Sequence, residues 1–113
     1  MRFLSTLIIL DSDKARERMG AQLRIYTINR GEMDAFLEHF KKEVLPTHEK
    51  VGYPVVATYV NRPQNEFVWM RTHEDAPDRD AKQKAFIDAC NAAGIKLGLN
   101  VAKMEVRELE SAW

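Results

Sequence analysis

The sequence predicts an α+β domain in which a four-stranded antiparallel sheet carries two helices, in the order β-α-β-β-α-β of ferredoxin-like folds. Three observations support this fold. Segments with the two-residue period of strands alternate with segments whose apolar residues recur at helical spacing. Two strand-like segments flank a short turn, as in a hairpin. Glycine and proline stand at the boundaries between segments.

The first predicted strand covers residues 22–29, and Gly31 ends it. A helix follows, because five apolar residues recur at helical spacing: Met33, Phe36, Leu37, Phe40 and Val44. Pro46 has no N–H to donate and clashes with the preceding turn. We therefore expect the helix to end or kink near Leu45 and residues 47–51 to form a separate turn.

The second half of the chain predicts a hairpin, a helix and a last strand. Residues 55–60 and 66–73 are of strand type and are joined by a turn at residues 61–65. Residues 75–78 have the acidic and proline residues favoured at a helix start, and Gly94 is a natural end. Residues 99–109 alternate again as a strand.

Composition excludes several classes of protein. The chain has 113 residues, enough for one domain, and 17 basic residues balance 17 acidic ones, so no basic surface for nucleic acid is expected. The single cysteine, Cys90, cannot form an internal disulfide, which fits a cytoplasmic protein. We divide the chain into an N-terminal extension (residues 1–20), a folded domain (residues 21–110) and a C-terminal tail (residues 111–113).

The extension is open to several interpretations. The apolar run at residues 3–10, FLSTLIIL, resembles that of a short signal peptide, but no small-residue cleavage site follows it. The run is also too short to span a membrane. Residues 4–10 could add an edge strand or belong to a loose tail, or Met19 could be the true start.

Two helices can cover only one face of a four-stranded sheet, so the other face needs a partner, a ligand or water. We expect the bare face to carry these residues: Arg24, Tyr26, Ile28, Phe67, Trp69, Arg71 and His73. Because this set is too aromatic for an ordinary surface, it predicts a homodimer built around a cavity.

A family resemblance rests on three segments: QLRIYTINRGEMDAFLEHF, EVLPTHEKVGYPVVATY and NEFVWMRTHEDAPDRDAKQKAF. In this order and spacing they resemble the NIPSNAP-type domains of the dimeric α/β-barrel superfamily, over about residues 22–109. The resemblance implies two ferredoxin-like chains whose sheets pack face to face around a pocket. Relatives in that superfamily include cofactor-free monooxygenases, haem-degrading enzymes, polyketide cyclases and members without a known reaction.

The candidate ligand-binding residues are Arg24, Tyr26, Phe67, Trp69 and Arg71. Aromatic residues supply flat walls, and a guanidinium on a buried face needs an acceptor, either Glu105 or Glu66 or an acidic group on a ligand. Ion pairing within the protein is the favoured alternative for both arginines.

The candidate catalytic residues are His73 and Tyr26. Carboxylates beside His73 in the sequence predict a raised pKa and a proton-shuttling role, or else an exposed position at the helix start. His39 should lie on the outer surface of the first helix, away from the site. The histidines show no metal-ligand spacing, and we expect no metal and no cofactor.

The sequence therefore predicts a homodimer that binds a small, partly apolar molecule, aromatic or acidic in character, without a defined reaction. The alternatives are a cofactor-independent monooxygenase, cyclase or isomerase acting on an aromatic or polyketide-like substrate, and a structural dimer with a filled barrel. No nucleic-acid partner and no membrane span are expected.

Overall fold

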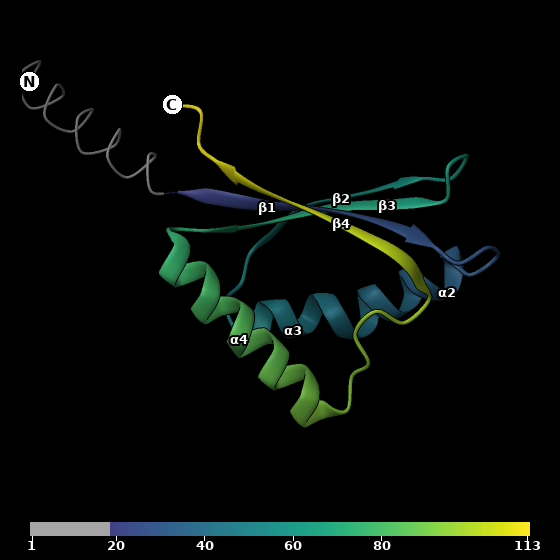
Figure 1. Cartoon of the computed structure of the whole chain (residues 1–113). Coiled ribbons are helices and arrows are strands. Elements are labelled where there is room, and N and C mark those ends of the chain that lie inside the picture. Colours follow the sequence, from purple (N-terminus) through teal and green to yellow (C-terminus); the bar gives the residue numbers. More distant parts are fainter. Residues whose placement is uncertain (1–18) are drawn as a thin grey trace, which may run out of the picture.

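A computed structural model describes residues 19–113 as a sheet with a layer of helices on one side (Figure 1). The interpretations of residues 1–18 lie outside this part of the chain. The elements follow in this order: β1 (Gly20–Ile28), α2 (Met33–His39), η1 (Phe40–Val44), α3 (Leu45–Lys50), β2 (Val55–Asn61), β3 (Glu66–His73), α4 (Ala76–Ala93) and β4 (Val101–Glu110). Within residues 19–113, no helix is long and apolar enough to cross a membrane.

The four strands form one antiparallel sheet in the order β2-β3-β1-β4, which confirms the predicted ferredoxin-like fold. β1 lies in the interior of the sheet, between β3 and β4. In this register Arg24 stands opposite Trp69 of β3 and Val106 of β4. Side chains from three strands are therefore brought together at the level of Arg24.

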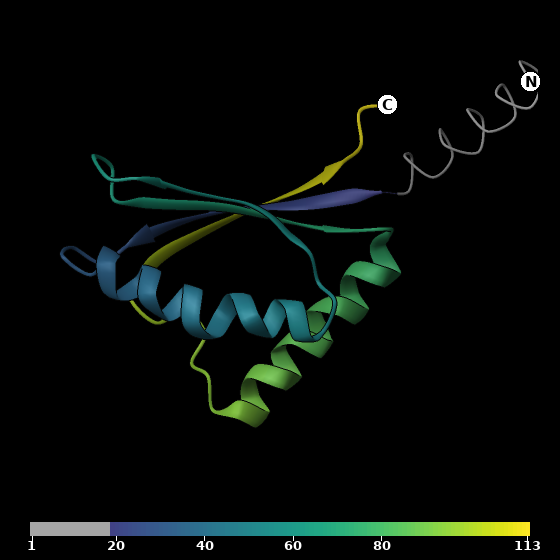
Figure 2. The same cartoon turned by 180° about the vertical axis from the view of Figure 1, so that it is seen from behind.

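The sequence predicted that the first helix ends or kinks near Leu45, with a separate turn at residues 47–51. The helix does not end there, and residues 45–50 are helical. α2, η1 and α3 form one continuous helix from Met33 to Lys50, which runs beneath the sheet (Figure 2). The π-helical segment η1 changes the hydrogen-bond register ahead of Pro46, and the N–H of Leu45 donates to the carbonyl of Phe40. The hydroxyl of Thr47 donates to the carbonyl of Glu43 at 2.7 Å. These bonds accommodate a proline that would otherwise break the helix.

The second helix begins and ends where the sequence predicted. Asp75 caps its N-terminus, and its carboxylate accepts a hydrogen bond from the N–H of Asp78 at 2.8 Å. Gly94 ends the helix with φ at +70°, in the left-handed region that glycine adopts without steric cost. The helix thus places Phe86 and Cys90 in the core.

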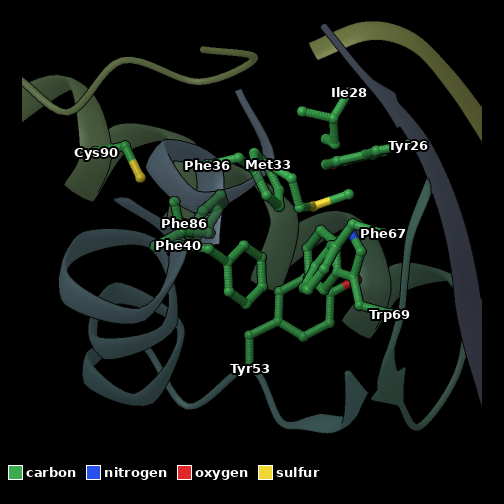
Figure 3. Close-up of a cluster of buried hydrophobic side chains, with 11 residues drawn as sticks. Tyr26, Ile28, Met33, Phe36, Phe40, Tyr53, Phe67, Trp69, Phe86 and Cys90 are labelled. Atoms are coloured by element: carbon green, nitrogen blue, oxygen red, sulfur yellow. The ribbon is translucent and has the colours of Figure 1, made fainter. Parts of the chain in front are cut away.

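The two faces of the sheet are the reverse of those predicted. The aromatic side chains of β1 and β3 point toward the helices, and Figure 3 shows them together with Phe36, Phe40 and Phe86. Trp69 packs edge-on against Phe40, with ring centroids 5.1 Å apart. The prediction for the bare face is therefore wrong for all seven residues: Arg24, Tyr26, Ile28, Phe67, Trp69, Arg71 and His73.

The error has a physical cause. Along β1 and β3, the face with the aromatic residues also carries arginine, glutamine and histidine, so its pattern resembled that of an exposed face. The other face carries mainly aliphatic residues, so its pattern resembled that of a core. Aromatic rings bury more area than aliphatic side chains, and α2, η1 and α4 supply phenylalanines to meet them. The bare face instead presents half-buried aliphatic side chains at its centre: Leu23, Ile25, Val68 and Met70.

Candidate functional site

A cavity of about 250 Å³ lies between the sheet and the helical layer. β1 and β3 line one wall, and the helices supply Phe36, Phe40 and Phe86. The α4–β4 loop and Met104 of β4 complete the lining. Residues of a single chain form this cavity on the helical side of the sheet, whereas the sequence predicted a pocket on the bare face.

The cavity unites four of the six predicted site residues: Arg24, Tyr26, Trp69 and Arg71. Phe67 is not among the lining residues. Its ring packs between Phe36 and Phe40, with centroids 4.9 and 4.8 Å away, and belongs to the core beside the cavity. The alternation of side chains along β1 and β3 therefore predicted correctly that most of these residues share one face. That face is the one covered by the helices and not the bare one.

The walls of the cavity are aromatic. Tyr26 and Trp69 meet edge to face at 5.8 Å, and Tyr26 meets Phe36 in the same way at 6.1 Å. Such contacts stabilise the pair beyond the area that it buries. The rings thus form a rigid apolar surface for a flat or hydrocarbon group.

Two guanidinium groups share one neutral acceptor in this cavity. Nη1 of Arg24 donates to Oε1 of Gln22 at 2.7 Å, and Nε of Arg71 donates to the same oxygen at 3.0 Å. The side-chain amide of Gln22 in turn donates to Glu108 at 2.7 Å. The two cations therefore stand close together, and the carboxylate of Glu108 is separated from them by an amide.

The predicted ion pairs with Glu105 and Glu66 do not form. Glu105 pairs with Ile25 in the sheet and Glu66 with Thr27, so both extend from the opposite face. Within residues 19–113, no carboxylate lies within ion-pair distance of either guanidinium. The positive charge in the cavity is thus compensated by neutral acceptors and aromatic rings.

Arg71 is the more deeply buried of the two arginines, with 3% of its surface exposed. Its guanidinium lies 4.4 Å from the ring centre of Tyr53 and 5.2 Å from that of Trp69. These cation–π contacts offset part of the cost of removing the charge from water. Burial lowers the pKa of Arg71, although arginine stays charged at any physiological pH.

His48 lies outside the cavity lining but contacts the lining residue Arg71, a role that the sequence analysis missed. Its ring is fully buried and stacks on Phe86, with ring centroids 3.9 Å apart. Nδ1 donates to the carbonyl of Val44 at 2.8 Å, so Nε2 is free to accept from Nη1 of Arg71 at 3.0 Å. Burial, and secondarily the charge of Arg71, lowers its pKa to about 4, and the ring is therefore neutral near pH 7.

The expected turn at residues 47–51 concealed this role. Once the helix continues through Pro46, His48 follows Val44 at the four-residue spacing of one helical face. That spacing is the signal in the sequence that could have predicted His48 beside the core.

His73 lies away from the cavity. It lines a separate recess with Gly20, Arg79 and Glu108, where a Cβ added at Gly20 would come within 2.5 Å of its Nε2. Burial lowers its pKa and outweighs the opposing effects of Glu108, Asp78 and Asp75. The expectation of a raised pKa was wrong because desolvation is the larger effect.

His39 lines the cavity, contrary to its expected position on the outer surface. Its Nε2 lies 2.9 Å from the carbonyl of Lys96, and its Nδ1 lies 2.8 Å from the carboxylate of Glu43. These contacts tie the first helix to the α4–β4 loop. Among residues 19–113, no cluster of three or more His, Cys, Asp or Glu side chains could hold a metal ion.

Solved structures share this fold in two groups. A NIPSNAP family protein from Agrobacterium tumefaciens superposes with a TM-score of 0.74 at 19% identity, covering 83% of this chain and 86% of its own. A NIPSNAP domain protein from Burkholderia xenovorans gives 0.72 at 18% identity, covering 82% and 94%. A candidate antibiotic biosynthesis monooxygenase from Nitrosomonas europaea gives 0.58 at 10% identity, covering 86% and 93%. At these identities the likeness establishes a common fold.

The sequence also identifies the family. The family model for NIPSNAP matches residues 21–93, and the chain therefore belongs to the NIPSNAP family, as the resemblance predicted. No curated protein sequence compared with the chain matches it.

The environment of His48 predicts a pH-dependent stability. Its pKa of about 4 in the folded state lies below the ordinary value of 6.5. Between these values the unfolded chain binds a proton that the folded chain does not, so the free energy of unfolding decreases as the pH is lowered from 6.5 toward 4. We expect this loss to reach about 3 kcal/mol for His48.

Urea unfolding at several pH values measures this contribution. His48→Gln should flatten the decrease, whereas the matched variant His39→Gln should retain it. An NMR titration that placed the pKa of His48 near 6.5 would contradict the neutral, buried ring.

Proposed function

We propose that the protein is a homodimer that binds a small, partly apolar molecule with an acidic group in the cavity of each chain, with no defined reaction. The pair of arginines that share the side-chain oxygen of Gln22 carries this proposal. Two cations this close repel each other, and a neutral amide compensates them only in part.

An anionic group would relieve this repulsion. Nη2 of Arg24 has only a weak contact, 3.9 Å from the sulfur of Met104. Nη2 of Arg71 has no hydrogen-bond acceptor among residues 19–113. A carboxylate or phenolate placed between these nitrogens would form charge-assisted hydrogen bonds to both cations, the stronger class of such bonds.

The remaining walls favour an apolar body for the same ligand. Tyr26, Trp69 and Phe86 present rings to the cavity, whose volume suits a molecule smaller than a typical drug. A ligand with an acidic end and a hydrocarbon or aromatic body would satisfy both parts of the cavity. We place this function in the cytoplasm, in line with the single buried thiol of Cys90.

Binding should depend on Arg24. Arg24→Ala is expected to weaken the binding of an aromatic acid such as benzoate by about 1 to 3 kcal/mol, the scale of a hydrogen bond to a charged group. Trp69→Phe should weaken it as well and, unlike alanine, leaves most of the core filled. Isothermal titration calorimetry measures both effects.

Arg62→Ala is the matched control, because Arg62 is exposed, pairs with Asp34, and neither residue lines the cavity. It should bind as the unaltered protein does. Equal affinities for Arg24→Ala and Arg62→Ala would remove the basis of the anion site.

The aliphatic face of the sheet is the surface through which the proposed homodimer would form. Leu23, Ile25, Val68 and Met70 form its centre, and Tyr59 of β2 beside them is 71% exposed. Among residues 19–113, no helix covers this side of the sheet (Figure 1). A second copy packed on it would remove this apolar area from water, and such obligate interfaces bury on the order of 2,000 Å² or more.

Met70→Asp should dissociate this dimer, because it places a charge at the centre of the apolar face. Sedimentation equilibrium at low micromolar concentration measures the mass. Ala92→Asp, at an exposed position of α4, is the control. A 13.1 kDa species from the unaltered protein would contradict the dimer.

A cofactor-independent enzyme is the second candidate, favoured by the shared fold of the candidate monooxygenase from Nitrosomonas europaea. Tyr26 would then act on the substrate, because its hydroxyl lies in the cavity and accepts from Nε of Arg24 at 2.9 Å. His73 lines the other recess and is the less suited of the two proposed catalytic groups. Oxygen consumption with a phenolic substrate that is lost in Tyr26→Phe would support a monooxygenase over a binder.

A further inference from the structure

The mouth of the cavity is rimmed by apolar side chains that remain in water. Four of them form a collar, which we define as Ile87, Leu97, Leu99 and Met104, with 38–45% of their surface exposed. They come from α4, the α4–β4 loop and β4. Single exposed apolar side chains scattered over a surface need no explanation, but four gathered at one opening do.

The collar forms where the α4–β4 loop contacts strand β4. A Cβ at Gly98 would lie 3.5 Å from the terminal methyl of Met104, so the loop rests against β4. Met104 stands opposite Tyr26 in the sheet, and its sulfur lies 3.9 Å from Nη2 of Arg24. The collar therefore continues directly from the cavity and from its charged end.

The proposed dimer would leave this collar exposed. Met104 pairs with Tyr26 on the side of the sheet that carries the helices, whereas the aliphatic face lies on the other side. A different occupant is needed to cover the collar. Lys84 and Asp88 of α4 beside it pair with each other at 2.6 Å, so these two side chains add no net charge to the collar.

We infer that the ligand is a single-chain amphiphile, a free straight-chain carboxylate whose acidic end meets Arg24 and Arg71 and whose hydrocarbon chain extends from the cavity over the collar. This inference rests on the proposed acid-binding function and specifies its ligand class. The cavity alone is smaller than the pockets that enclose drug-sized molecules, so a longer chain gains contacts only by reaching the collar.

The test is a chain-length series read by the fluorescence of Trp69. Trp113 is 84% exposed at the C-terminus, and Trp113→Phe leaves Trp69 as the single tryptophan. Hexanoate, octanoate and decanoate are titrated below their micellar concentrations. We expect Kd to fall about three- to fourfold for each added methylene that reaches the collar.

Variants assign this dependence to the collar. Leu97→Ser/Leu99→Ser should flatten the dependence of Kd on chain length. The matched control Val56→Ser/Val60→Ser changes two exposed valines of β2, outside the cavity lining, and should keep it. Circular dichroism melting establishes that both variants are folded.

Three outcomes would overturn the inference. Equal Kd values for the three acids, together with binding of benzoate, would refute the amphiphile and leave the acid site in place. An unchanged chain-length dependence in Leu97→Ser/Leu99→Ser would remove the collar from the ligand path. Co-sedimentation with phosphatidylglycerol vesicles in the absence of free acid would identify a membrane surface as the occupant.

A further result would refute both proposals together. This is the case if benzoate and the three straight-chain acids neither change the fluorescence of Trp69 nor give heat in calorimetry. The proposed acid-binding function then fails, and the amphiphile proposal fails with it.

Discussion

The aromatic layer between the sheet and the helices is the constraint on which the other features depend. Tyr26, Phe67 and Trp69 from the strands meet Phe36, Phe40 and Phe86 from the helices, and each ring buries more area than an aliphatic side chain. This packing decides which face of the sheet the helices cover. It thereby decides which face is left for a partner and on which side a cavity can form.

The polar site follows from the same packing. Side chains alternate along a strand, so Arg24 must share the face of Tyr26, and Arg71 must share the face of Trp69. Covering the rings with helices therefore also covers two guanidiniums, which need hydrogen-bond acceptors. Gln22, His48 and the hydroxyl of Tyr26 supply them, and none of the three is a carboxylate. The cavity thus keeps a positive charge that an acidic ligand can use.

The helix through Pro46 is the second element that the site requires. If the chain had turned after Leu45, residues 47–51 would have followed a separate path and His48 would have had no defined place beside Arg71. The π-helical segment at Phe40–Val44 keeps the helix intact, and the bond from His48 to the carbonyl of Val44 sets the tautomer that accepts from Arg71. A local irregularity of the backbone therefore determines the chemistry of a side chain one turn away.

The sequence by itself determined the order of the elements, the hairpin, the ends of α4 and the family, because each of these depends on short-range patterns. Period-two alternation, the cap at Asp75 and the stop at Gly94 all act within a few residues of one another. It also determined that Arg24, Tyr26, Trp69 and Arg71 would lie on one face. Only the tertiary structure decided which face the helices cover. The alternation along a strand separates its side chains into two faces, but it does not say which of the two packs against the helices. The tertiary structure also brought His48 to Arg71 and left His73 in another recess, because contacts between residues 23 positions apart depend on how the helix packs on the sheet.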